Sequence, residues 1–274
     1  MSGGPKPIVT RVARCGVRDS RFFGWSVFDD LLGKESFLGL LALGLTGRRF
    51  SDAEVALLDD LAVVLTAADP RIWVLKAARL LASLGDPLAG ALGGQLCLVG
   101  ARVGGAPVVA AGHLLVELKS VVNSAFPAQE NVAHVVAAIN GREWIAGFGV
   151  PYREHDQRVD ALARRARDLG RDTGHHFRLV APLVEAVRTI KPGLSPNASL
   201  PIAALCLDLG FEPRHMGSLV AAMLFLPTIA NTFEESELMS PSLRELPGES
   251  VDYAGPPPRR SPRARTAPPS GAEG

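Results

Sequence analysis

The stretch "SDAEVALLDDLAVVLTAADP" (residues 51–70) decides the fold class, because it carries clear signals of an amphipathic helix. Ser51 precedes Glu54 by three residues, which is the spacing of a capping box at a helix N-terminus. Apolar side chains then recur at intervals of three and four residues, at Val55, Leu58, Leu61 and Leu65. Such residues share one face of a helix, and Pro70 is expected to end it.

Helical patterns continue on the C-terminal side of this stretch. They predict further helices over residues 71–85, 86–106, 156–170, 199–211 and 214–235. The 86–106 segment is rich in glycine and alanine and nearly uncharged, so we expect a buried central helix that ends at Gly104 and Gly105. No segment alternates convincingly with the period of two that is typical of a half-buried strand. The predicted fold class is therefore all-α.

The charge balance of the chain argues against a nucleic-acid partner. The 274 residues include 29 Lys and Arg against 28 Asp and Glu, so the formal net charge is +1. Nucleic-acid binding needs a basic face, and the short basic run at 259–265 is too isolated to provide one.

The sequence also predicts a cytoplasmic protein that does not cross a membrane. Its N-terminus lacks the apolar core of a signal peptide. The most apolar window, residues 217–233, is interrupted by proline and asparagine and is predicted to be a buried helix. Cys15, Cys97 and Cys206 form no CxxC pair, so we expect buried, reduced thiols.

The C-terminal residues 246–274 have a different composition from the rest of the chain. They are rich in proline and arginine and nearly free of large apolar side chains. Such a segment cannot offset the entropy that it would lose on ordering, so a disordered tail is predicted.

The segment "GFGVPYREHDQR" (residues 147–158) is the first candidate for a functional site. Two glycines make a turn, ionisable side chains follow, and a helix begins. Arg153 and Arg158 flank that helix N-terminus, where free N–H groups already favour an anion. His155 beside Asp156 has the chemistry of an oriented acid–base group. Solvated surface residues explain the same pattern, so both interpretations stay open.

Other chemical motifs find little support. The segment "GARVGGA" (100–106) lacks the lysine of a phosphate-binding P-loop, and no GxSxG nucleophile motif occurs. The six histidines form no HExxH pair, so no metal site is expected.

Four stretches, read in order, resemble the citrate synthase superfamily, most closely its short members of the citryl-CoA lyase type. They are "ESFLGLLALGLTGRRFSDAEVALLDDLAVVL" (35–65), "KAARLLASLGDPLAGALGGQLCLVGARVGGA" (76–106), "GFGVPYREHDQRV" (147–159) and "SPNASLPIAALCLDLGFEP" (195–213). The resemblance covers roughly residues 30–235 in the right order and spacing.

This resemblance implies an all-α homodimer whose subunits each have a large and a small domain. The family's active sites lie in the cleft between those domains, where an acyl-CoA and a keto acid form or break a carbon–carbon bond. An aspartate removes an α-proton from the thioester, one histidine stabilises the enol, and another acts on the keto-acid carbonyl. A weakly acidic C–H bond needs this positioned base and hydrogen-bond donor.

The sequence departs from the family pattern where that chemistry should be. The two histidine positions are occupied by Val103 and Val150, and the catalytic aspartate position by Ser199. The family's "DHG" segment is replaced by "AADP" (67–70), and the arginine of the last helix falls near Leu224. Valine can neither donate nor accept a proton, so ordinary citrate synthesis or citryl-CoA cleavage is expected to be negligible.

The surviving residues define the predicted site. Asp69, His155 and Ser199 are the weak catalytic candidates that remain. The residues expected to contact the CoA thioester are Arg153, Arg158, Gly147 and Gly149. Arg102 and Asn197 are expected to contact the substrate. No metal and no tightly bound cofactor are expected, only a CoA thioester as a possible substrate.

The resemblance also sets the expected domain boundaries. A large helical domain should comprise 1–106 and 211–245, with a small helical domain of 107–210 inserted, and Gly104–Gly105 as a hinge. Two interpretations stay open. One is an acyl-CoA condensing enzyme or lyase with an atypical site, and the other is a non-catalytic homologue that acts as a binding or regulatory dimer partner.

Overall fold

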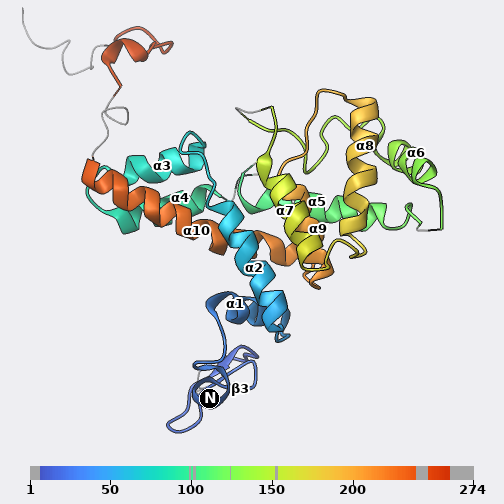
Figure 1. Cartoon of the computed structure of the whole chain (residues 1–274). Coiled ribbons are helices and arrows are strands. Elements are labelled where there is room, and N and C mark those ends of the chain that lie inside the picture. The colour runs from blue at the N-terminus through green and yellow to red at the C-terminus, as the bar shows by residue number, and fades with distance from the viewer. Residues whose placement is uncertain are drawn as a thin grey trace, which may run out of the picture. The chain divides into compact units, whose positions relative to one another are not determined.

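The computed structural model describes residues 7–98, 100, 103–123, 125–151, 154–238 and 246–259. The chain divides into two compact units, Met1–Met239 and Ser240–Gly274. The first unit is built almost entirely of helices, as the sequence predicts (Figure 1).

The helices of the first unit follow the expected order along the chain. They are α1 (Phe37–Thr46), α2 (Asp52–Leu65), α3 (Trp73–Ala82), α4 (Pro87–Cys97), α5 (Gly105–Leu118), α6 (Ala128–Ile139), α7 (Gln157–Asp168), α8 (Val180–Ile190), α9 (Ser199–Asp208) and α10 (Pro213–Leu238). A short 3₁₀ turn, η2 (Phe177–Leu179), leads into α8.

A small antiparallel sheet precedes the helices. Its strands β1 (Ala13–Arg14), β2 (Arg21–Phe22) and β3 (Trp25–Ser26) have two residues each and pair in the order β1-β2-β3. Phe22 is paired with Ala13 on one side and with Trp25 on the other. A π-type turn, η1 (Val27–Leu31), follows β3.

Helix α2 has the cap that the sequence predicts but ends earlier than expected. The Ser51 side chain accepts from the Glu54 N–H, and the Glu54 carboxylate accepts from the Ser51 N–H, which completes the capping box. The helix ends at Leu65 instead of at Pro70. Residues 66–70 are thereby free of the helix, and three of them line the cavity described below.

The segment 86–106 is not the single buried helix that the sequence predicts. Helix α4 ends at Cys97, and Gly104 (φ +67°) is the N-cap of α5, which begins at Gly105. Small residues do allow close packing on one face, since a Cβ at Gly90 would lie 2.7 Å from the Ala78 carbonyl oxygen in α3. The opposite face of α4 carries exposed leucines.

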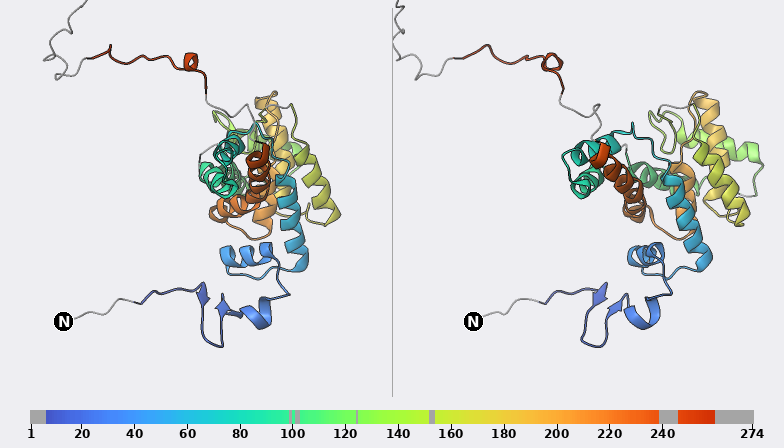
Figure 2. Two further views of the ribbon diagram at one scale, coloured as in Figure 1. Left: turned by 90° about the vertical axis from the view of Figure 1, so that its left-hand side faces the viewer. Right: turned by 60° about the vertical axis from the view of Figure 1, so that its left-hand side comes forward.

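The core lies where α5, α9 and α10 meet, with α2 and α7 packed beside them (Figure 2). Helix α9 is the most deeply buried, because Leu200 through Leu207 are all inaccessible or nearly so. Gly105 lets α5 approach α10 closely, since a Cβ there would lie 2.7 Å from the Gly217 Cα. This close packing brings the N-terminal ends of α5 and α9 next to α10.

Helix α10 contains the most apolar window of the sequence. It is long and apolar enough to span a membrane, but interior helices of globular proteins pass the same test. It packs against α2, α3, α4 and α5. Buried Glu235 forms an ion pair with Arg79 of α3 (2.7 Å), which ties the C-terminal part of α10 to that helix.

The three cysteines differ in their environments. Cys206 is buried as expected, and burial raises the pKa of its thiol to about 12. Cys97 is half-buried and Cys15 is exposed, so the prediction of three buried thiols was wrong for Cys15. In the second unit the described residues 246–259 are all exposed and contain one short turn, η4 (Gly248–Ser250).

Candidate functional site

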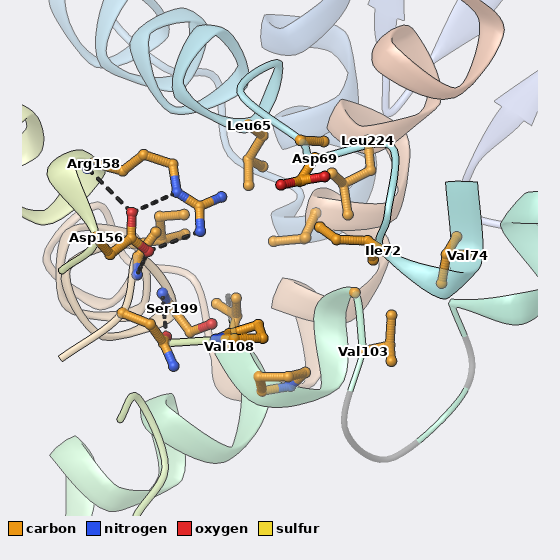
Figure 3. A pocket seen from close by; sticks show the side chains of 18 of the residues that line it. Leu65, Asp69, Ile72, Val74, Val103, Val108, Asp156, Arg158, Ser199 and Leu224 are labelled. Atoms are coloured by element: carbon orange, nitrogen blue, oxygen red, sulfur yellow. Dashed lines mark hydrogen bonds and ion pairs between the residues drawn. The ribbon is translucent and has the colours of Figure 1, made fainter. Parts of the chain in front are cut away.

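The first unit contains a cavity of about 480 Å³ to which five separate parts of the chain contribute (Figure 3). This size lies within the roughly 300–1,000 Å³ range of small-molecule sites. Its described lining comes from residues 65–75, 98–108, 144–158, 197–202 and 220–228. One side of the cavity is polar and the opposite side is apolar.

One side is held together by hydrogen bonds between the glycine turn and the segment before α9. The Gly149 N–H donates to the Ser195 carbonyl (2.8 Å), and the Asn197 N–H donates to the Gly147 carbonyl (2.9 Å). The Asn197 side-chain amide donates to the Gly149 carbonyl (2.9 Å) and its oxygen accepts from the Ser199 N–H (3.0 Å). Asn197 therefore joins the two loops that frame the cavity.

Both glycines of this turn are required by the backbone. Gly147 and Gly149 have φ angles of +84° and +93°, which side chains other than glycine rarely adopt. At Gly147 a Cβ would also lie 2.8 Å from the Leu200 Cβ, so the turn presses directly on α9.

Asp156 is the centre of the polar network on this side. It is fully buried and caps the N-terminus of α7 by accepting from the Arg158 N–H (3.2 Å). Its carboxylate also accepts from Arg158 Nε (2.8 Å) and Nη2 (2.7 Å) and from the Ala198 N–H (2.9 Å). One carboxylate thus joins α7, the Arg158 guanidinium and the segment that leads into α9.

These contacts set the protonation of Asp156. Burial raises its pKa, but the hydrogen bonds from Arg158, the positive charge of Arg158 and the donated N–H groups together outweigh burial. The net result is a pKa below the ordinary aspartate value, so Asp156 is ionised at neutral pH. We call Asp156, Arg158, Asn197 and the turn 147–149 the polar wall.

The opposite side of the cavity is apolar. It is formed by Leu65 at the end of α2, Ile72 before α3, Val103 before α5 and Leu224 of α10 (Figure 3). We call these four residues the apolar wall. Val103 and Leu224 stand at positions for which the family resemblance implies a histidine and an arginine.

One carboxylate lies beside the apolar wall. Asp69 lines the cavity, and its side chain is 15% exposed. It accepts from Arg71 Nη2 (2.8 Å), Nε and backbone N–H, while Arg71 is largely exposed. In Figure 3, Asp69 and Ser199 lie on opposite sides of the cavity. Asp69 can therefore accept a proton from a bound molecule, and Ser199 can donate a hydrogen bond.

The structure brings most of the predicted site residues together. Those that line the cavity are Asp69, Ser199, Arg158, Gly147, Gly149 and Asn197. His155 is not among the lining residues. Its Nε2 contacts Asp160 Oδ2 at 2.7 Å, and both side chains are more than half exposed, which is a surface ion pair. Arg102 and Arg153 lie outside the described residues.

Some lining residues were missed by the sequence reasoning. Trp73 and Trp144 both contact the cavity and are 51% and 53% exposed, so they lie at its open rim. Ile72 and Val108 line the interior. Trp73 belongs to a recognisable helix start, but nothing in its local pattern indicates a cavity. Among the described residues, no cluster of three His, Cys, Asp or Glu side chains can hold a metal ion.

Comparison with known proteins identifies the family. A family model described as "Citrate synthase, C-terminal domain" matches residues 35–242, which is well over half of the chain. The chain belongs to the citrate synthase family. Among curated proteins, no sequence match was found.

Solved structures show that this family member has the fold of citryl-CoA lyases and citrate synthases. A citryl-CoA lyase from Hydrogenobacter thermophilus is 24% identical, with a TM-score of 0.77 over 96% of this chain and 100% of that chain. An ATP citrate lyase from Methanothrix soehngenii, in complex with citrate and coenzyme A, is 17% identical, with a TM-score of 0.75 over 93% of this chain and 43% of that chain. A citrate synthase from Thermotoga maritima MSB8 is 20% identical, with a TM-score of 0.60 over 85% of this chain and 62% of that chain.

Proposed function

We propose that this citrate synthase family member binds an acyl-CoA thioester at the cavity and forms or breaks a carbon–carbon bond with an atypical set of groups. The main support for the proposal is that the positions which the family uses for chemistry meet at one cavity. Positions far apart in the sequence, which the family resemblance assigns to catalysis or substrate binding, all line one cavity: Ala68, Asp69, Val103, Val150, Ser199 and Leu224. A chance resemblance would scatter such positions.

The proposed chemistry uses Asp69 and Ser199. Asp69 removes the α-proton of the bound thioester, and the Ser199 hydroxyl donates a hydrogen bond to the thioester oxygen as negative charge develops there. The resulting enolate carbon attacks a carbonyl acceptor, whose π electrons move to its oxygen, and that oxygen takes up a proton from solvent; the reverse steps break the bond. Both groups belong to the described lining of the cavity.

Ordinary citrate chemistry is not part of the proposal. Val103 and Val150 cannot donate a hydrogen bond or a proton, and each lost donor of this kind costs about 10²–10³ in rate. We therefore expect acetyl-CoA with oxaloacetate, and citryl-CoA, to react negligibly.

The test has a binding part and a reaction part. Isothermal titration with CoA and acyl-CoA thioesters should show binding in the micromolar to millimolar range of ordinary enzyme substrates. Mass spectrometry of reactions over a panel of thioesters and carbonyl acceptors should then find a condensation or cleavage product whose formation Asp69→Asn removes. The matched control is Asp59→Asn, an exposed α2 carboxylate outside the cavity lining. Absence of CoA binding would refute the proposal.

A second candidate function is favoured by the apolar wall. Aliphatic side chains at reacting positions fit a non-catalytic homologue that binds a ligand or regulates an active partner. The triple variant Val103→His, Val150→His and Ser199→Asp separates the two functions. Recovery of citrate-type activity would show that the framework of the cavity is intact, and continued inactivity would show that the cavity has diverged further.

We also propose a homodimer, supported by an exposed face on α4. Leu88, Leu92 and Leu96 recur every four residues, and their side chains are 60%, 53% and 76% exposed. An apolar face of this kind is typical of an association surface. Leu92→Glu should lower the mass measured by light scattering to that of a monomer, whereas Val63→Glu on an exposed position of α2 should not.

The large and small domains, with the boundaries given above, belong to the same proposal. Closure about Gly104–Gly105 would exclude water from the thioester. Gly104 has a positive φ, which allows a sharp change of direction between α4 and α5.

A further inference from the structure

The charges that line the cavity are few. Among the described lining residues, Asp69, Asp156 and Arg158 carry a formal charge at neutral pH. Two are negative and one is positive. A ligand with several carboxylates would need more positive charge than these residues supply, because a buried carboxylate is stable only when it is paired.

The single positive charge among these residues is already used. Arg158 gives its Nε–H and one Nη2–H to the carboxylate of Asp156 at 2.8 and 2.7 Å, so its positive charge is already paired within the protein. Taking Arg158 away from Asp156 would leave a buried carboxylate with only N–H donors. Asp69, on the opposite side, is paired with Arg71 (2.8 Å) and adds no positive charge for a ligand carboxylate.

The remaining surface of the cavity is apolar and well buried. Leu65, Val74, Val108, Ile202 and Val220 are each no more than 7% exposed, and they line the cavity together with the apolar wall. Small-molecule sites of this composition take up apolar groups and gain affinity from the surface that they remove from water.

From these observations we infer that the described lining accepts an uncharged aliphatic acyl group, longer than acetyl, and does not itself hold a second substrate that carries several carboxylates. This inference rests on the proposed binding of a CoA thioester, and it names the substrate class of the same site. The acyl chain lies against Leu65, Ile72, Val103 and Leu224, while the CoA moiety lies toward the rim.

Two tryptophans at the rim of the cavity can report ligand binding directly. Trp73 and Trp144 line the cavity and are half exposed, whereas Trp25 belongs to β3 outside the lining. A ligand in the cavity should therefore change the fluorescence of two of the three tryptophans. The Trp73→Phe and Trp144→Phe variants assign the signal.

The experiment titrates the full chain with CoA, acetyl-CoA, butyryl-CoA, hexanoyl-CoA and octanoyl-CoA, followed by tryptophan fluorescence and calorimetry. Each added methylene should tighten binding about fourfold until the cavity is full, which corresponds to about 0.8 kcal/mol per buried CH₂. Citrate and oxaloacetate, added alone or with CoA, should give no saturable signal in the millimolar range.

Variants of one side chain then locate the acyl group. Leu224→Ala should weaken hexanoyl-CoA binding about tenfold and leave the affinity for CoA unchanged, because only the acyl contact is shortened. Leu224→Arg should abolish the gain from chain length and allow citrate to bind. Val63→Ala, an exposed residue of α2 outside the lining, is the matched control and should change neither affinity.

The outcomes separate the inference from the function on which it rests. If CoA and every thioester fail to bind, the proposed function is wrong. If CoA binds but affinity is independent of acyl length, or if citrate binds as tightly as hexanoyl-CoA, the inference is wrong while the proposed function stands. An affinity that rises with chain length and falls in Leu224→Ala supports both.

Discussion

The two walls of the cavity use their side chains in different ways. On the polar wall, Asp156, Arg158 and Asn197 are occupied by one another and by backbone groups of the loops. On the apolar wall, Leu65, Ile72, Val103 and Leu224 present hydrocarbon to the cavity. The polar groups that remain at this site therefore hold the framework, and the surface offered to a ligand is mainly apolar.

Under the proposed function, the fold and the chemistry of the cavity depend on different residues. The glycine turn, Asn197 and Asp156 fix how the segments before α7 and α9 meet, so their loss would disturb the fold itself. Val103 and Leu224 lie at the surface of the cavity, where replacement changes what the site can bind at little cost in stability. Substitutions on the two walls measure this difference.

Removal of the Asp156 side chain should cause the largest loss in the free energy of unfolding. Asp156→Ala leaves the Arg158 guanidinium and the Ala198 N–H without their partner, so the free energy of unfolding should fall by about 3 kcal/mol or more. Urea unfolding measures the change. Asp160→Ala is the control on the same helix, because its ion pair with His155 is exposed, and it should cost no more than about 0.5 kcal/mol. Equal effects of the two variants would contradict the role given to the polar wall.

A substitution in the glycine turn should cause the next largest loss in the free energy of unfolding. Gly147→Ala forces a side chain into a positive φ and against Leu200, so it should lower the free energy of unfolding by about 2–3 kcal/mol. Gly141→Ala is a matched control, since Gly141 has a similar φ of +78° but no atom within 4 Å of the added Cβ. It should cost about 1 kcal/mol. The difference between the two unfolding curves isolates the contact with α9, and no difference would show that the turn does not press on that helix.

Lowering the pH should remove the stabilisation that ionised Asp156 gives to the polar wall, and it should leave the contacts of the apolar wall unchanged. The pKa of Asp156 lies below its ordinary value, so its contribution to stability is complete above about pH 4 and is lost as pH falls through the lowered pKa. Asp208, half-buried beside His176, and Glu54 of the capping box have lowered pKa values and act in the same direction. Thermal unfolding between pH 7 and pH 2 should show Tm falling below about pH 4, and Asp156→Asn should make this fall shallower. A Tm that does not change with acid would contradict the assignment.

Substitutions in the apolar wall should lower the free energy of unfolding least. Val103 is half-buried, so Val103→Ala should lower the free energy of unfolding by about 1 kcal/mol or less. The same urea experiment measures it. A loss as large as that of Asp156→Ala would show that the apolar wall also holds the framework, and the distinction between the walls would disappear.

Much of this framework can be predicted from the sequence. The capping box of α2, the helical periodicity and the four family-like stretches give the fold class and place Asp69, Ser199 and Asn197 in one site. They could not show that α2 ends at Leu65 or that Gly104 is the N-cap of a helix, because tertiary packing decides where a marginal helix ends. They also could not show that Asn197 bonds to Gly149, 48 residues away, or that Asp156 bonds to Ala198, 42 residues away, since only the folded chain brings these segments together.

A crystal structure with hexanoyl-CoA tests the central claim most directly. The account predicts acyl carbons within about 4.5 Å of Val103 and Leu224, with the Asp156–Arg158 pair intact. An acyl chain bound elsewhere, or Arg158 turned away from Asp156 to hold a ligand carboxylate, would contradict it.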